Sequence, residues 1–190
     1  MWRIFISIFF ILYLLQAPAT ADMHGAAAEP ESDRLNELFS ALKEEHNTVA
    51  ARRIADRIQQ EWKRSGGATA DMLIDWAREA AVQDKHHVAL DFLDQVVTLY
   101  PEYVEGWNSR ALVHLMMNDF NRAMADLSRT LALEPRHFGA MNGVAGILRA
   151  TGREELALGV YRRMLEVYPM QRGAQRALIR LTEDSLGQRL

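Results

Sequence analysis

The sequence predicts an all-α protein, an α-solenoid of antiparallel helix pairs built on a 34-residue period and closed by a C-terminal capping helix. The strongest observation is a proline that recurs with this period, at Pro101, Pro135 and Pro169. A fixed period of about 20–50 residues is typical of stacked supersecondary units. From Asp33 onward, apolar residues recur every three or four positions, as on one face of a helix. Three other sets keep the same interval: Ala77, Ala111 and Ala145; Ala89, Ala123 and Ala157; and Leu99, Leu133 and Val167.

Residues 1–21 have the layout of a cleavable secretory signal. Arg3 precedes an apolar run over Ile4–Leu15, and Ala19-Thr20-Ala21 places small residues before a cut after Ala21. The run is shorter than the roughly 20 apolar residues that span a bilayer, and an uncleaved N-terminal anchor is the alternative. We therefore expect a periplasmic or secreted protein in which residues 22–32 form a flexible leader.

The helical domain is predicted over residues 33–186, with full units at 70–103, 104–137 and 138–171. In the middle unit, Ala111 and Ala123 fall where two antiparallel helices cross, and small side chains let the two backbones approach closely. Pro135 ends the second helix, because proline cannot continue a helix and disfavours helical backbone in the residue before it.

A degenerate unit over residues 32–65 is predicted to precede the full units, with an insertion in Ser65-Gly66-Gly67-Ala68 before unit 70–103. After unit 138–171, residues 172–186 are predicted to form a capping helix with a polar outer face, which closes the last hydrophobic surface of a repeat array. The outward residues of this cap are Arg172, Arg176 and Arg180.

The units resemble the tetratricopeptide repeat (TPR), whose pattern has a bulky residue at position 4, small residues at 8 and 20, a bulky residue at 24 and proline at 32. The departure is Ala80, where the family usually has a large aromatic residue. The matching residues are Leu73, Ala77, Ala89, Leu93 and Pro101; Trp107, Ala111, Ala123, Leu127 and Pro135; and Met141, Ala145, Ala157, Tyr161 and Pro169.

The resemblance implies that the first helix of each unit lines a concave groove that binds a peptide or protein segment. Asn108 and Asn142 hold the same groove position in successive units, and an amide offers both a donor and an acceptor to an extended backbone. The candidate groove residues are Arg78, Asn108, Leu112, Leu115, Asn142 and Arg149.

No catalytic residue, metal site or cofactor is predicted. The chain has no cysteine, its histidines do not have the spacing of metal ligands, and no nucleophile stands beside a general base. A net charge of -3 gives no indication of a nucleic-acid partner. Gly143 and Gly146 lack the strand and the Gly-Lys-Ser/Thr sequence of a phosphate loop. We attribute them to close helix packing, and the alternative is that they leave room for a ligand backbone in the groove.

The sequence therefore predicts a non-enzymatic interaction module or adaptor of the cell envelope. The alternative is a structural subunit or homo-oligomer that uses its convex face or its charged ends. Unit 70–103 has seven acidic and two basic residues, whereas residues 172–190 have four arginines and two acidic residues. Such a charge gradient could steer a partner or favour head-to-tail self-association.

Overall fold

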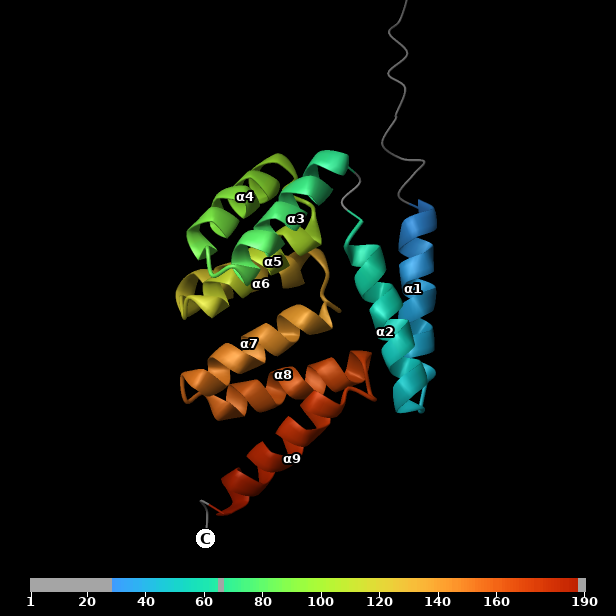
Figure 1. Cartoon of the computed structure of the whole chain (residues 1–190). Coiled ribbons are helices and arrows are strands. Elements are labelled where there is room, and N and C mark those ends of the chain that lie inside the picture. The colour runs from blue at the N-terminus through green and yellow to red at the C-terminus, as the bar shows by residue number, and fades with distance from the viewer. Residues whose placement is uncertain (1–28, 65–66, 188–190) are drawn as a thin grey trace, which may run out of the picture.

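The computed structural model describes residues 29–64 and 67–187, and within these ranges it contains helices only (Figure 1). The all-α class is therefore confirmed. The predicted signal segment 1–21 and residues 22–28 of the leader lie outside the described residues. The helices are α1 (Glu29–Glu44), α2 (Thr48–Trp62), α3 (Ala68–Val82), α4 (His86–Leu99), α5 (Val104–Met116), α6 (Phe120–Leu133), α7 (Phe138–Ala150), α8 (Glu154–Val167) and α9 (Arg172–Gly187).

Helix α1 begins at Glu29, inside the stretch that we assigned to the leader. One feature of this start explains the difference. Proline is favoured in the first turn of a helix, where its missing N–H has no intrahelical role, and Pro30 stands there.

Helices α3 to α8 form three antiparallel pairs that stack in chain order, and α9 packs on α8. The predicted helix crossings are confirmed, because the alanines of both periodic sets are buried. The two sets are Ala77, Ala111 and Ala145, and Ala89, Ala123 and Ala157. A Cβ at Gly106 would lie 2.8 Å from Val96 Cγ1, so α5 and α4 also approach closely where one pair meets the next.

The turn inside each pair repeats with the same period. Asp84, Asn118 and Gly152 have φ angles of 57°, 57° and 72°, and they keep the same interval along the chain as the prolines. Their left-handed backbone lets the following residue donate to a carbonyl of the first helix, as in the 2.8 Å bond from Asp119 N to His114 O. The turn predicted at Gly152 is confirmed, and its equivalent in the first pair is Asp84.

The joint between pairs is also periodic. The residue before each proline has non-helical backbone, with φ and ψ of −129° and 65° at Tyr100, −132° and 95° at Glu134, and −133° and 79° at Tyr168. Proline disfavours helical backbone in the residue before it. The prolines therefore end α4, α6 and α8 at equivalent places and set the direction of the next helix.

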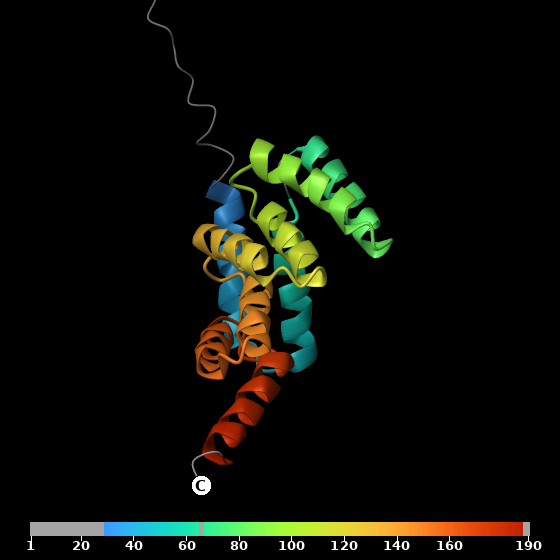
Figure 2. The same cartoon turned by 90° about the vertical axis from the view of Figure 1, so that its left-hand side faces the viewer.

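The hairpin of α1 and α2 does not stack on α3 as the next unit of the array. Instead it lies along one side of the molecule and packs against α7, α8 and α9 (Figures 1 and 2). Phe39 and Trp62 share one hydrophobic core with Phe138 and Tyr168. Arg136, in the joint before α7, donates to Asn36 Oδ1 at 2.8 Å and lies 4.1 Å from the centre of the Phe39 ring.

In the part of the chain that the structure describes, no helix is long and apolar enough to cross a membrane.

The fold predicts the effect of overpacking a helix crossing. Replacing the fully buried Ala123 with leucine is expected to destabilise the protein by about 1–3 kcal/mol, because the new side chain must push α5 and α6 apart. Ala125→Leu is the matched control, since Ala125 is exposed two residues away on the same helix. Urea unfolding of both variants measures the difference, and equal stability of the two would contradict this crossing.

Candidate functional site

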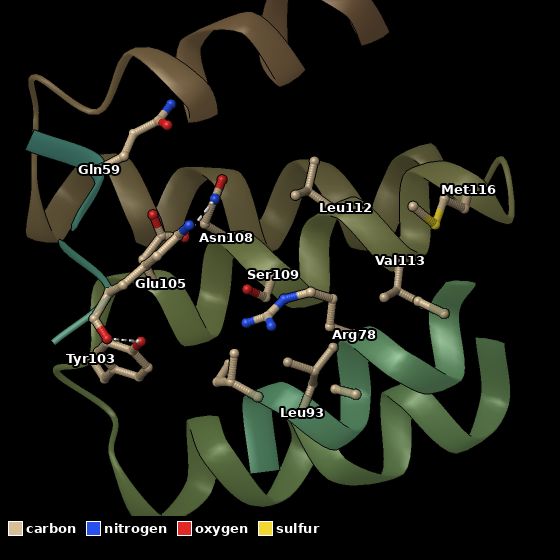
Figure 3. Close-up of a pocket in the computed structure, with 14 residues that line it drawn as sticks. Gln59, Arg78, Leu93, Tyr103, Glu105, Asn108, Ser109, Leu112, Val113 and Met116 are labelled. Atoms are coloured by element: carbon tan, nitrogen blue, oxygen red, sulfur yellow. Dashed lines mark hydrogen bonds between the residues drawn. The ribbon is translucent and has the colours of Figure 1, made fainter. Parts of the chain in front are cut away.

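A cavity of about 340 Å³ lies between the first helices of two successive pairs, α3 and α5, and the C-terminal turn of α2 borders it (Figure 3). Residues from these three helices, from the joint before α5 and, at Leu93, from α4 line it. They are Gln59, Lys63, Ile74, Ala77, Arg78, Ala81, Leu93, Tyr103, Glu105, Asn108, Ser109, Leu112, Val113 and Met116.

The cavity is polar at one end and apolar at the other. Tyr103, Glu105 and Asn108 lie near α2, whereas Leu112 and Met116 lie toward the far end of α5 (Figure 3). Leu112 and Met116 are 45% and 57% exposed, so they present apolar surface at this end of the cavity. The site is therefore suited to a ligand with an apolar part and a hydrogen-bonding part.

Asn108 supplies the unsatisfied hydrogen-bonding group of this cavity. Its side chain is only 8% exposed, and its Nδ2 donates to Glu105 Oε2 at 2.8 Å. Its Oδ1 is buried without a hydrogen-bond partner among the described residues. Because buried polar atoms are nearly always paired in folded proteins, Asn108 Oδ1 is an acceptor whose hydrogen-bonding capacity the described residues leave unused.

Glu105 and His137 hold Asn108 in this orientation. His137 Nδ1 accepts from the Ala140 N–H at 2.9 Å and so caps α7, which places the ring proton of the neutral form on Nε2. That nitrogen lies 3.4 Å from Glu105 Oε1. The other carboxylate oxygen accepts from Asn108, so the amide Oδ1 is left without an acceptor role inside the protein.

Two pKa values are shifted at the polar end, in opposite directions. Burial acts to raise the pKa of the Glu105 carboxyl, but hydrogen bonds and charge from His137, with a hydrogen bond from Asn108, outweigh it and lower that pKa below its usual value. Burial, and then the Glu105 charge, raise the pKa of Tyr103, whose hydroxyl donates to the Lys63 carbonyl at 3.0 Å. Glu105 is therefore ionised and Tyr103 neutral at neutral pH.

The α1–α2 hairpin is fixed to this same cluster. The Trp62 ring stacks on the His137 ring with 4.0 Å between their centres, and Tyr103 holds the end of α2 through Lys63. These contacts place Gln59 and Lys63 at the border of the cavity. Sequence reasoning missed both residues, because no local pattern shows on which surface a hairpin will pack.

Arg78 lies at the mouth of the cavity, where it points toward the centre in Figure 3. Its Nη1 is 2.8 Å from Asp75 Oδ1, one turn earlier on α3. Both side chains are well exposed, so the pair is weak and Arg78 can turn toward a ligand at little cost.

The structure brings together three of the six predicted groove residues, namely Arg78, Asn108 and Leu112. Leu115 is a correction, because it points into the core between α5, α6 and α7, where it packs with Ala111 and Leu127. Its place on the helix is about 60° from that of Leu112, since successive residues turn by 100°.

Asn142 and Arg149 lie apart from this cavity. The exposed Asn142 borders a second cavity of about 440 Å³ between α2, the start of α7 and the start of α9. Gln59 of α2 borders both cavities, so the hairpin stands between Asn108 and Asn142. Arg149 is exposed in the last turn of α7 and borders neither cavity.

The two glycines that we attributed to close packing have different surroundings. A Cβ at Gly143 would lie 3.0 Å from Leu127 Cδ1, so close packing explains this glycine. A Cβ at Gly146 would meet nothing within 4 Å, so packing does not explain it. Among residues 29–64 and 67–187, no three histidine or acidic side chains are grouped as metal ligands.

A stack of antiparallel helix pairs with a cavity along their first helices defines a protein of the α-solenoid class. No family model matches the chain. A TPR repeat-containing protein of Rhizobium etli is 40% identical over 187 residues, which covers 95% of this chain and 91% of that protein. The chain therefore belongs to the TPR repeat-containing proteins.

Two solved structures have the same helical arrangement. The first TPR domain of Spaghetti (RPAP3) bound to the HSP90 peptide SRMEEVD has a TM-score of 0.58 at 21% identity, over 62% of this chain and 96% of that one. The TPR2B domain of yeast Sti1 in complex with pHsp70 has a TM-score of 0.56 at 17% identity, over 62% and 99% of the two chains. At these identities the likeness concerns the fold.

The ionised Glu105 predicts an acid-sensitive stability. Because its pKa is lowered on folding, it stabilises the protein above its unfolded pKa of about 4.3, and this contribution is lost as the pH falls through the lower folded value. Glu105→Gln is expected to cost about 1–3 kcal/mol at pH 7, with a cost that shrinks below about pH 4.

Urea unfolding of the wild type and Glu105→Gln between pH 3 and 7 measures this effect. Glu166→Gln is the matched control, because Glu166 is exposed on α8. A cost of Glu105→Gln that does not change with pH would show that the charge of Glu105 contributes nothing.

Proposed function

We propose that this protein is a non-enzymatic binding protein whose cavity between α3 and α5 holds a segment of a partner protein. The buried acceptor without a partner, Asn108 Oδ1, is the observation that carries the proposal. The TPR relatives support it, since two of the solved structures with this fold are complexes with HSP90 and pHsp70 ligands.

The bound segment is expected to place a donor near Asn108 and an apolar side chain near Met116. A backbone N–H of the segment would give Asn108 Oδ1 its missing hydrogen bond. The apolar side chain would cover Leu112 and Met116, whose exposed surface is the driving force for association. Arg78 at the mouth favours an acidic group beside that side chain.

The test is capture of a partner by the wild-type protein, followed by affinity measurements with Asn108→Ala. Removing the amide is expected to weaken binding by about 1–3 kcal/mol, because a desolvated donor of the ligand loses its acceptor. Circular dichroism and urea unfolding check that the variant remains folded.

Asn142→Ala is the matched comparison, because Asn142 is the equivalent residue of the next pair but borders the second cavity. A loss with Asn108→Ala alone supports a ligand in the cavity between α3 and α5. A loss with both variants supports a longer segment that crosses both cavities. If neither variant weakens binding, this groove is not the binding site.

We also propose that the protein works in the cell envelope, after export. The support is the layout of Arg3, the apolar run Ile4–Leu15 and the Ala19-Thr20-Ala21 sequence. N-terminal sequencing of the protein from an extracytoplasmic fraction is expected to begin at Asp22. An intact Met1 on protein from the cytoplasm would contradict export.

A further inference from the structure

Two positions on the first helix of each pair normally contact the second helix of the pair before it. The first is held by Met72, Gly106 and Ala140, and the second by Trp76, Arg110 and Val144, each set following the period of the repeat. In the second pair, Gly106 approaches Val96 of α4, and Arg110 Nη1 lies 2.8 Å from Asp94 Oδ1 of the same helix. In the third pair Ala140 is fully buried.

In the first pair these positions have no preceding helix to contact. The hairpin that comes before α3 in the chain packs on α7–α9, and neither of its helices lies along α3. Met72 and Trp76 are accordingly 42% and 45% exposed, with the Trp76 ring 5.5 Å from that of Phe92 on α4. This surface, the α3 end face, consists of Met72, Trp76 and the adjoining acidic residues Asp75 and Glu79.

The opposite end of the molecule has a surface of opposite charge. Helix α9 and the α3–α4 pair stand at opposite ends in both views (Figures 1 and 2). Arg172, Arg176 and Arg180 are exposed on α9, and Ile179 beside them is 59% exposed. We call this surface the α9 face.

We propose that the α9 face of one molecule packs on the α3 end face of a second copy, so that the protein associates head to tail. The charges decide between the possible arrangements. A two-fold contact between α3 end faces would oppose two units that each have seven acidic and two basic residues. The head-to-tail contact instead sets arginines of α9 against Asp75 and Glu79, and it covers Met72, Trp76 and Ile179.

The dimensions of the two faces also agree. Helix α3 has 15 residues and α9 has 16, so each presents a rod of similar length. A contact between two different surfaces leaves one free surface of each kind on every dimer, so growth continues until a ring closes or a fibre forms. Met72, Trp76 and Glu79 do not line the cavity between α3 and α5, and the two surfaces adjoin only where Asp75 pairs with Arg78 at the cavity mouth.

Sedimentation velocity of the purified protein tests the contact with two single-face variants. Trp76→Glu blocks the α3 end face, and the double change Arg176→Glu/Arg180→Glu blocks the α9 face. The wild type is expected to associate as its concentration rises and to dissociate as salt is added, because the charges are exposed. Each variant alone is expected to be monomeric, whereas an equimolar mixture forms a dimer and nothing larger, through its one intact contact.

Three controls accompany the variants. Arg162→Glu/Arg163→Glu reverses the same charges on the exposed face of α8 and is expected to associate like the wild type. Asn108→Ala is expected to do the same, which separates self-association from ligand binding. Met72→Glu provides a second block of the α3 end face, with circular dichroism as the check on folding.

The outcomes decide the proposal. A dimer from the mixed variants supports it. A wild type that stays monomeric at every concentration overturns it, and so does association of both single-face variants at wild-type strength. The head-to-tail arrangement is also overturned if Trp76→Glu loses association while Arg176→Glu/Arg180→Glu associates like the wild type. The α3 end face would then bind a surface other than α9.

Discussion

The close approach of paired helices at six buried alanines is the constraint on which the rest of this structure depends. Each crossing leaves room for only a methyl group, so the two helices of a pair are held at one angle and one separation. The left-handed turns at Asp84, Asn118 and Gly152 and the joints before the prolines repeat with the same period. Successive first helices therefore face the same way, and they create the cavity between α3 and α5.

The N-terminal hairpin changes what this regular stack presents to solvent. Its docking through Trp62 and His137 closes one end of the cavity and separates Asn108 from Asn142. The same docking leaves α3 without a preceding helix, which exposes Met72 and Trp76. The packing of the α1–α2 hairpin on α7–α9 therefore shapes the proposed ligand site and also exposes the proposed surface for self-association.

The polar cluster at the cavity illustrates how a site is prepared for a ligand. His137 caps α7 and contacts Glu105, and Glu105 accepts from Asn108, so each group fixes the role of the next. The chain of contacts ends at an amide oxygen that nothing in the described protein satisfies. Leaving a buried acceptor unpaired is unfavourable, and a ligand that donates to it removes that cost.

The sequence by itself determined the helix pairs and their period. These features follow from local patterns: the spacing of apolar residues, small residues at helix crossings, and prolines at helix ends. Three of the predicted groove residues, Arg78, Asn108 and Leu112, line one cavity because they lie on the first helices of two successive units. Only the tertiary structure decided where the hairpin packs, and with it the separate location of Asn142, the inward side of Leu115 and the role of Gln59 and Lys63. These features depend on contacts between residues far apart in the chain, such as Trp62 and His137, and a periodic pattern has no information about such contacts.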